Sequence, residues 1–473
     1  MHIFHISAEC YPAAKVGGLA DVVGALPKYQ NRLGHVAKVV VPAYENKFKK
    51  ENAFETVYNN TLELGQFHFP YSILKESSGK LGFELYLIDI PGLFDRPEIY
   101  SYEDDTERFL SFQIAFLDWI TKTNENPDLL HCHDHHTGLI PFMVSYCDKY
   151  QKIVATPTIL TIHNAQYQGW FGFDKINYLP AFNREKAGYL EWNGIINPLA
   201  SAIKCVNLIT TVSTSYLEEM RQSANGLENL LQFERGKSIG ILNGIDTEVW
   251  NPETDPMVES NYALKTFKSG KAKNKKFLCK EFNLDPEKPL FTFIGRLVGE
   301  KGADLLPQIC SIALNKYPKK INILILGSGD PEVENSLTGL QNFYHGNYNA
   351  YIGYNEKLAH NVYASADFLM MPSRMEPCGL NQMYSLRYGT VPIVRRTGGL
   401  RDTVLDMGDG GFGICHDQAS VSDVIHSIDR AVELFSDSKK FDNIRKTGMQ
   451  IDHSWEKAAA TYISAYQSLI PQS

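Results

Sequence analysis

Short apolar runs alternate with longer amphipathic stretches along most of this chain. In the first half, the runs that predict strands are His2–Ser7, His35–Pro42, Leu85–Ile90, Asp128–His133, Pro157–His163 and Leu208–Ser213. Several of them are apolar on both faces, which is typical of parallel strands covered by helices on each side. Helical periodicity lies between them, for example over Thr106–Thr121 and Gly138–Lys149. This order predicts βαβ units in an open, doubly wound α/β sheet.

The same alternation occurs a second time. Residues 251–276 contain prolines, a Ser-Gly pair and a run of lysines, so they are predicted to connect two domains. The strands predicted after them are Leu290–Leu297, Ile321–Leu326, Ala350–Gly353, Phe368–Met371, Val391–Val394 and Gly411–Cys415. We therefore expect a second open α/β sheet. The last segment, from Trp455, has the apolar spacing of a helix that either caps the second domain or crosses back to the first.

Composition narrows the class of ligand. The chain has 473 residues, 44% of them hydrophobic, which suits two large packed domains. Its net charge of −8 argues against nonspecific binding to nucleic acid, so a phosphate-bearing ligand would be small. The eight cysteines form no C-x-x-C pair, and the sequence shows neither a signal-peptide pattern nor an apolar run long enough for a membrane. We expect a cytoplasmic protein with neither nucleic acid nor membrane as a partner.

Two Gly-Gly pairs follow predicted strands. Lys15 precedes Gly17 and Gly18, after which Leu19–Leu33 reads as a helix. Adjacent glycines let a phosphate approach backbone N–H groups at a helix N-terminus. The pair recurs after Val391–Val394, at residues 398 and 399. Either pair alone serves strand-to-helix packing about as often, but two at corresponding places suggest two similar halves that face one ligand.

Cations and a carboxylate follow strands of the second half. Arg296 and Lys301 leave its first strand in a stretch that also holds three glycines, so both side chains can converge on one diphosphate. Glu376 lies between a strand and the predicted helix Leu380–Tyr388, where its carboxylate can accept hydrogen bonds from sugar hydroxyls. The alternatives are a solvated basic turn and an N-terminal helix cap.

The histidine-rich run His131–His136 first suggests a metal site. Alternate residues of an extended chain face opposite ways, so these side chains cannot all converge, and no distant Cys or His cluster is expected to complete a tetrahedron. We therefore expect neither a metal nor a cofactor. His163 ends another predicted strand, where a histidine can enter the same crevice.

With these residues assembled, a family resemblance becomes specific. Lys15 to Pro27 resembles the signature K-x-G-G-L-A-D-V-x-G-A-L-P of the glycogen/starch synthase family, and within it of the bacterial glycogen synthases. Other matching stretches are His133-Asp134, His136–Gly138, His163-Asn164, Leu242–Asp246, Gly295–Gly302, Glu376–Leu380 and Arg395–Leu400. The resemblance covers nearly the whole chain.

The resemblance implies a fold and a reaction. The fold would be GT-B, with two Rossmann-like doubly wound domains facing an interdomain cleft: residues 1–250 for the acceptor, a linker over 251–276, residues 277–454 for the donor, and a helix over 455–473 that crosses back to the first domain. The reaction would be retaining transfer of glucose from a nucleotide diphosphate glucose to the non-reducing end of an α-1,4-glucan. ADP-glucose is the favoured donor and UDP-glucose the alternative.

Site residues carry over position by position. Lys15, Arg296 and Lys301 would bind the donor diphosphate. Glu376 would contact the transferred glucose, and His163 would line the reacting face. The other donor-binding residues would be Tyr354, stacked on the base, with Gly17, Gly18, Asp21, Asp134, Asn243, Cys378, Gly379, Leu380, Thr397, Gly398 and Gly399.

The chain departs from the family pattern in places. His135 stands where the family usually has Trp. Related glycosyltransferases carry a second Glu eight residues after the first; here, as in the synthase branch, that position is Tyr384, so Glu376 stands alone. Three rival functions remain open. They are a retaining GT-B enzyme that forms a disaccharide, a nicotinamide-dependent oxidoreductase, which would lack its usual G-x-G-x-x-G, and a catalytically silent glucan-binding protein.

Overall fold

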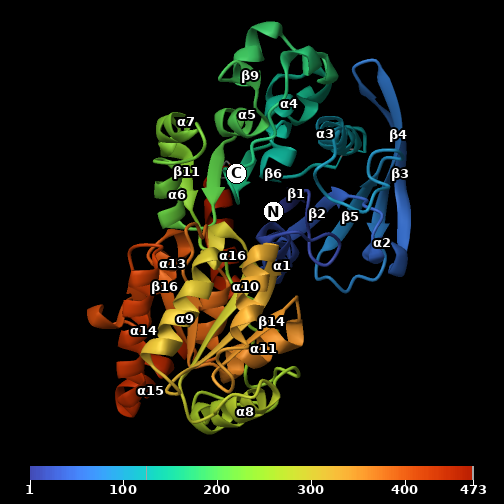
Figure 1. Cartoon of the computed structure of the whole chain (residues 1–473). Helices are drawn as coiled ribbons and strands as arrows, with labels where there is room; N and C mark the ends of the chain where they lie inside the picture. The colour runs from blue at the N-terminus through green and yellow to red at the C-terminus, as the bar shows by residue number, and fades with distance from the viewer. Residues whose placement is uncertain (124, 471–473) are drawn as a thin grey trace. The chain divides into compact units, whose positions relative to one another are not determined.

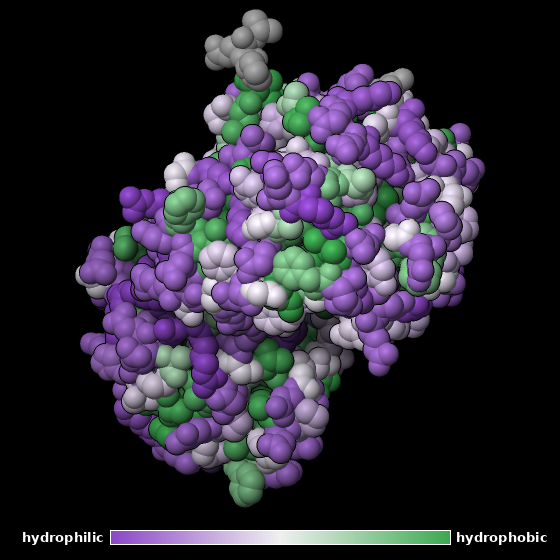
Figure 2. Space-filling view, turned by 90° about the horizontal axis from the view of Figure 1, so that it is seen from above, coloured by the Kyte–Doolittle hydropathy of each residue, from purple (hydrophilic) through white to green (hydrophobic). Residues whose placement is uncertain are grey.

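The computed structural model describes residues 1–123 and 125–470 (Figure 1). The chain divides into two compact units, the first made of Met1–Asn243 with Trp455–Ser473 and the second of Gly244–Ser454. On the face drawn in Figure 2, hydrophobic residues lie in small groups among hydrophilic ones. Within the described residues, no helix combines the length and apolar character needed to span a bilayer.

A nine-stranded sheet forms the centre of the first unit, in the order β11-β10-β7-β6-β1-β2-β5-β4-β3. The strands from β11 to β5 are parallel, whereas β4 and β3 are antiparallel. Their bounds are β1 His2–Ile6, β2 Val36–Pro42, β3 Phe54–Leu64, β4 Phe67–Glu76, β5 Glu84–Asp89, β6 Leu129–His133, β7 Thr158–Ile162, β10 Leu208–Thr211 and β11 Ser238–Gly240; β8 Glu191–Trp192 and β9 Ile195–Ile196 form a separate pair. The predicted doubly wound sheet is confirmed.

The hairpin of β3 and β4 is absent from the sequence-based prediction. Most β3 side chains are exposed or only half-buried, so the strand lacks the continuous apolar run that marks the parallel strands. The hairpin extends the sheet beyond β5 at its edge (Figure 1). In the sheet order, β4 of the hairpin lies five positions from β7, the strand that precedes His163.

Helices cover the sheet of the first unit. They are α1 Gly18–Arg32, α2 Lys47–Glu51, α3 Asp105–Lys122, α4 Ile140–Tyr146, α5 Pro198–Cys205, α6 Thr214–Met220, α7 Glu228–Phe233 and α16 Trp455–Gln467. The helix predicted over Gly138–Lys149 is too long. It ends because Cys147 pairs with Phe182 and the Asp148 N–H donates to the Ala181 carbonyl at 3.2 Å.

The last helix, α16, belongs to the first unit, although more than two hundred residues of the second unit precede it. Trp455, Ala459 and Tyr462 pack in one buried cluster with Leu26 of α1 and Ile3 of β1. This cluster fixes α16 beside α1, and it places the aromatic side chains of α16 next to the strands of the sheet.

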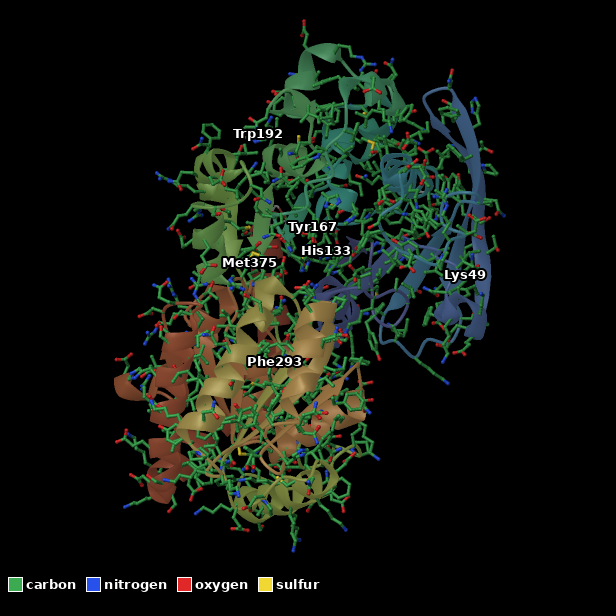
Figure 3. The ribbon with its side chains drawn as sticks, in the orientation of Figure 1. Lys49, His133, Tyr167, Trp192, Phe293 and Met375 are labelled. Carbon is green, nitrogen blue, oxygen red and sulfur yellow. The ribbon has the colours of Figure 1, made fainter. Side chains whose placement is uncertain are left out.

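The second unit holds a six-stranded, fully parallel sheet in the order β14-β13-β12-β15-β16-β17. The strands are β12 Leu290–Leu297, β13 Asn322–Gly329, β14 Tyr348–Ile352, β15 Phe368–Met371, β16 Val391–Arg395 and β17 Ile414–His416. The helices are α8 Phe267–Glu281, α9 Leu306–Lys316, α10 Pro331–Leu340, α11 Glu356–Ser365, α12 Asn381–Arg387, α13 Gly398–Thr403, α14 Val421–Ser436 and α15 Ser438–Met449. Phe293, labelled in Figure 3, lies in the core of this unit.

The lysine-rich stretch predicted as a linker is different in the structure. Its last part, residues 267–276, lies in α8, and all of it belongs to the second unit. The Lys271 ammonium is buried and donates to three backbone carbonyls and the Thr390 hydroxyl, while Lys275 pairs with Asp367 at 2.7 Å. The two lysines therefore extend inward, Lys271 to hydrogen-bond acceptors and Lys275 to a carboxylate, whereas composition alone suggested a solvated connector.

Both sheets reverse their strand order beside the first strand of the unit. In the first unit the chain moves from β1 to β2 on one side and returns to β6 on the other; in the second it moves from β12 to β13 and returns to β15. Ligands of open α/β sheets bind beyond the carboxyl ends of the strands at such reversals. The loops after β1, β6, β12 and β15 therefore lead to the candidate site residues.

Candidate active site

The first loop of interest follows β1 and ends in the Gly-Gly pair. Gly17 precedes the first turn of α1, and no side chain caps this helix among the described residues. A Cβ atom on Gly17 or Gly18 would meet open space, so the turn is accessible to a ligand. The Lys15 ammonium lies 2.6 Å from the Asp21 carboxylate, and both side chains are partly exposed. This arrangement offers a cation beside an open helix N-terminus.

Glu9 is a residue of this loop that the sequence-based reasoning missed. Its Oε2 accepts hydrogen bonds from the backbone N–H of Val16 at 2.6 Å and of Gly17 at 2.9 Å, and its Oε1 accepts from the Tyr100 hydroxyl at 2.7 Å. The Gly17 amide, expected to face a phosphate, is thus bound by a protein carboxylate. The sequence offered one indication of this role, because Glu9 is an acidic residue between the first predicted strand and the Gly-Gly pair.

Asp134 and His163 come from the neighbouring strands β6 and β7. Asp134 has a φ of 56°, which is costly for a residue with a side chain. Its Oδ1 accepts the His163 N–H at 2.7 Å, so the strained residue holds the loop that carries His163. Burial raises the pKa of Asp134 to about 7, against the opposing effect of hydrogen bonds from the backbone N–H of His163 and Asn164.

The histidines converge more than expected. His131 and His133 lie on one face of β6, because residues two apart on a strand share a face, and β1 brings His5 into register with His131. One ligand atom from each of these three rings lies within 4.8 Å of the others. His163 also joins them, with its Nε2 3.0 Å from Nδ1 of His133 (His133 is labelled in Figure 3). The prediction was that no distant Cys or His cluster completes a tetrahedron; His5, from a distant strand, does join His131 and His133, which makes a group of three ligand atoms.

The second unit brings Lys301 and Glu376 together. The Lys301 ammonium lies 2.5 Å from Oε1 of Glu376, and the Ser373 hydroxyl donates to Oε2 at 2.9 Å. Arg296 leaves β12 with 65% of its side chain exposed and lies 3.6 Å from Glu300. The unit therefore presents one exposed guanidinium and one carboxylate-bound ammonium on the same loop.

The loops that carry these groups are fastened to each other. Arg374 makes a bidentate contact to Asp304, with N–O distances of 2.5 and 2.8 Å, and its Nη1 also donates to the Gly299 carbonyl at 2.7 Å. Gly302 has a φ of 67°, and a Cβ atom there would lie 2.3 Å from the Pro372 carbonyl oxygen. The loop after β12 thus fits against the loop after β15, which fixes Lys301 beside Glu376.

The second Gly-Gly pair serves close packing. A Cβ atom on Gly398 would lie 2.0 Å from the Glu376 carbonyl oxygen, and one on Gly399 would lie 2.0 Å from that of Cys378. The Gly399 N–H donates to the Glu376 carbonyl at 3.0 Å, so this amide has a protein partner where a donor oxygen was expected. These two glycines let α13 approach the backbone that carries Glu376.

The remaining candidates lie at loop positions in both units. Tyr354 follows β14 and is 83% exposed, as a residue whose ring stacks on a base requires. Asn243 ends the continuous part of the first unit and is buried. Cys378, Gly379 and Leu380 join β15 to α12, and Thr397 precedes α13; the Cys378 and Thr397 side chains are buried.

Comparison with known families covers most of the chain. The family model described as starch synthase catalytic domain matches residues 2–233, and that described as glycosyl transferases group 1 matches residues 274–447. A glycogen synthase of Flavobacterium johnsoniae is 62% identical over 472 residues and covers 100% of both chains. A glycogen synthase of Geobacillus stearothermophilus is 36% identical and covers 99% of this chain and 98% of its own.

Solved structures agree in fold. The catalytic domain of starch synthase IV from Arabidopsis thaliana, bound to ADP and acarbose, has a TM-score of 0.90 at 30% identity and covers 100% of this chain and 99% of its own. Sucrose-phosphate synthase from Thermosynechococcus elongatus, at 17% identity, covers 99% of this chain and 98% of its own, and shares the fold with a TM-score of 0.63. The predicted GT-B fold is thereby confirmed. The chain belongs to the glycogen/starch synthase family and is a hexosyltransferase of that type.

Proposed function

We propose that this enzyme transfers glucose from a nucleoside diphosphate glucose, with ADP-glucose favoured, to the non-reducing end of an α-1,4-glucan, with retention at the anomeric carbon. The observation that carries the proposal is the group formed by Lys301, Glu376 and Arg296 on the loops after β12 and β15. A cation pair suits a diphosphate, and a fixed carboxylate suits the hydroxyls of a sugar. The related starch synthase IV was solved with ADP, which is the diphosphate that ADP-glucose would release.

In this proposal the bond between glucose C1 and the diphosphate oxygen breaks as a bond forms between C1 and the acceptor hydroxyl oxygen. The hydroxyl proton passes to the departing diphosphate, so no protein base is needed. Arg296, Lys301 and Lys15 would neutralise charge that develops on the leaving group. Lys301 would exchange part of its contact with Glu376 for the diphosphate, and Glu376 would then accept hydrogen bonds from the sugar.

A double displacement through a second carboxylate has little support in the sequence and structure. The position eight residues after Glu376 is Tyr384, whose ring stacks on Trp250 with 3.8 Å between ring centroids. This side chain contributes packing to the second unit. A front-face, oxocarbenium-like step at a single face of the sugar is therefore the mechanism we favour.

The test is incorporation of labelled glucose into glycogen from ADP-glucose and UDP-glucose in parallel, each with and without EDTA. We expect faster incorporation from ADP-glucose, unaffected by chelation, into a product that an α-1,4-specific amylase degrades. Incorporation that requires a divalent metal would contradict the metal-free mechanism. Transfer only to glucose or another small acceptor would favour a disaccharide-forming enzyme.

A further inference from the structure

A continuous series of hydrogen bonds crosses the first unit and ends at His163. It starts at a backbone carbonyl of β7, where the Thr210 hydroxyl donates to the Leu160 oxygen at 3.3 Å. Thr210 Oγ1 lies 2.5 Å from Thr161 Oγ1, which lies 2.6 Å from Nε2 of His131. Either hydroxyl can donate across the short Thr161–Thr210 contact; we assign the Thr210 proton to the Leu160 carbonyl, which can only accept, and Thr161 then donates to Thr210. The Thr161 proton is then used as well, and His131 must carry its proton on Nε2.

The series continues through the last helix. With its proton on Nε2, a neutral His131 accepts at Nδ1, where the Tyr466 hydroxyl lies 2.7 Å away. Tyr466 therefore donates to His131 and accepts from the amide nitrogen of Gln30 at 3.1 Å. The orientation of the Gln30 amide agrees with this direction, because its nitrogen faces Tyr466 and its oxygen faces Nε2 of His5 at 2.8 Å. Because an amide oxygen only accepts, His5 carries its proton on Nε2.

The same reasoning assigns the proton positions of His133 and His163. Nδ1 of His5 must accept, and it lies 3.1 Å from Nε2 of His133, which therefore holds a proton. Nδ1 of His133 must then accept from Nε2 of His163 at 3.0 Å. His163 is left with its proton on Nε2 and a bare Nδ1, for which the described part of the chain supplies no hydrogen-bond partner.

This assignment holds only if the four histidine rings are neutral, and burial favours the neutral form of each. Desolvation lowers the pKa of His5 to about 4 and that of His163 to about 3, and it holds the pKa values of His131 and His133 well below the usual range. Any one of these four rings would donate from both nitrogens if it were protonated. The hydrogen-bond series would then reverse at that ring and leave two donors facing each other.

We propose that this series is a positioning device that holds His163 as its Nε2–H tautomer and leaves Nδ1 as an obligate acceptor for a hydroxyl group. His163 would then bind an O–H donor and could not act as a general acid. The inference rests on the proposed function in one respect, namely that the hydroxyl belongs to the sugar substrate. Gln30 and Tyr466 become positioning residues, although neither lies on a loop that carries a candidate ligand.

A metal ion is the competing explanation for His5, His131 and His133, whose ligand atoms lie within 4.8 Å of one another. In this structure each of the six ring nitrogens has a hydrogen-bond partner. An ion would have to replace the His5–His133 contact and at least one other. The hydrogen-bond series needs no such rearrangement, so we favour it and treat metal binding as an outcome of the test.

The direct measurement is the tautomer of His163, read from long-range 15N–1H correlation spectra of the full chain labelled at histidine. Wild type should show the pattern of a neutral imidazole with its proton on Nε2. The informative variant is Thr210→Val, which removes the hydroxyl that sets the direction of the series. We expect the Nδ1–H tautomer of His163 to appear in that variant, although six other residues of the series lie between the two positions.

Thr292→Val is the matched control. Its hydroxyl is also buried and donates to a carbonyl of a neighbouring parallel strand, that of Phe368, at 3.1 Å, but it lies in the other unit. This variant should leave the His163 spectrum unchanged. A second variant, Gln30→Met, removes the acceptor for His5 and should mix the tautomers as well, whereas Gln113→Met alters a buried amide of the same unit outside the series and should not.

Three results would overturn the proposal. They are a wild-type His163 with its proton on Nδ1, a Thr210→Val spectrum identical to wild type, and stoichiometric Zn²⁺ that shifts the His5 and His133 signals together. Glucose transfer tests the proposed function separately. We expect Thr210→Val to lose about 10-fold in kcat/KM, the value of roughly one hydrogen bond to substrate, and Thr292→Val to lose little. Absence of transfer in wild type would contradict the function while leaving the tautomer result standing.

Discussion

At the scale of single residues, the two Gly-Gly pairs turn out to have different physical roles. The pair at 17 and 18 faces open space beside the Lys15 ammonium, which suits a ligand that approaches the backbone. The pair at 398 and 399 is packed against the backbone of residues 376 to 378. Sequence similarity between the two turns suggested one shared role, but the neighbours that distinguish them come from distant parts of the chain.

Gly398→Ala should therefore be costly. Its Cβ atom would lie 2.0 Å from the Glu376 carbonyl oxygen, and its φ of 43° adds strain, so we expect a loss of about 3 kcal/mol in the free energy of unfolding. Gly410→Ala is the control, because it has a φ of 79° but open space around the new atom; about 1 kcal/mol is expected there. Urea denaturation measures both. Equal losses would mean that the close approach to Glu376 is unimportant.

Glu9 leads to a second prediction at this scale. Glu9→Gln replaces the carboxylate that binds the Val16 and Gly17 amides with a weaker, neutral acceptor, so the Lys15 loop should open more often. We expect hydrogen exchange at these two amides to accelerate by about 10-fold, while amides in the centre of α1 keep their rates. Unchanged exchange at Val16 and Gly17 would show that the carboxylate does not hold the loop.

At the scale of elements, most parallel strands were predictable because they are buried on both faces and form their own apolar runs, whereas the short parallel strand β11, which is not buried, was missed. The β3–β4 hairpin was not predictable either, since its exposed side chains break such a run. Helix α8 was mistaken for a linker because the inward direction of Lys271 and Lys275 depends on acceptors more than ninety residues later in the chain. The candidate site residues proposed from sequence are those within the motifs, whereas Glu9, on the loop of the first Gly-Gly pair, was missed. Gln30 and Tyr466 could not be found from sequence, because only folding brings them to the histidines.

Helix α16 should contribute strongly to the stability of the first unit. Trp455 is buried against α1 and β1, so Trp455→Ala should reduce the free energy of unfolding by about 3 to 5 kcal/mol. Its neighbour Glu456 has an exposed side chain 3.8 Å from Arg32, and Glu456→Ala should change stability by less than about 1 kcal/mol. Chemical denaturation followed by circular dichroism would separate the two. Similar small effects in both variants would place α16 outside the cooperative core.

At the scale of the whole molecule, the buried histidines should make stability depend on pH. Burial lowers the pKa of six histidines of the first unit, His5, His131, His133, His135, His136 and His163. The unfolded chain therefore binds more protons than the folded one once the pH falls below about 6.5. Their contribution is fully present above that pH and is lost as the pH decreases, by up to about 1.4 kcal/mol per pH unit for each histidine.

Asp134 acts in the opposite direction. Its folded pKa of about 7 lies above the usual value, so its contribution is present below about pH 4 and is lost as the pH rises to about 7. One carboxyl cannot offset six histidines, and the free energy of unfolding should fall between about pH 6.5 and pH 5. His136→Phe should reduce this slope by about one proton, and His68→Phe, at an exposed position, should not. A stability that is flat over this range would contradict the burial of neutral histidines.

The most direct test of the account is the turnover of glucose transfer after removal of the cations on the loop that follows β12. Arg296→Ala and Lys301→Ala should each lower kcat by about 100-fold or more with ADP-glucose and glycogen, because each loses one contact to the leaving diphosphate. Lys316→Ala, which removes an exposed lysine paired with Asp429 in the same unit, should leave kcat within about twofold. Near-normal turnover in both Arg296→Ala and Lys301→Ala would contradict the proposed site.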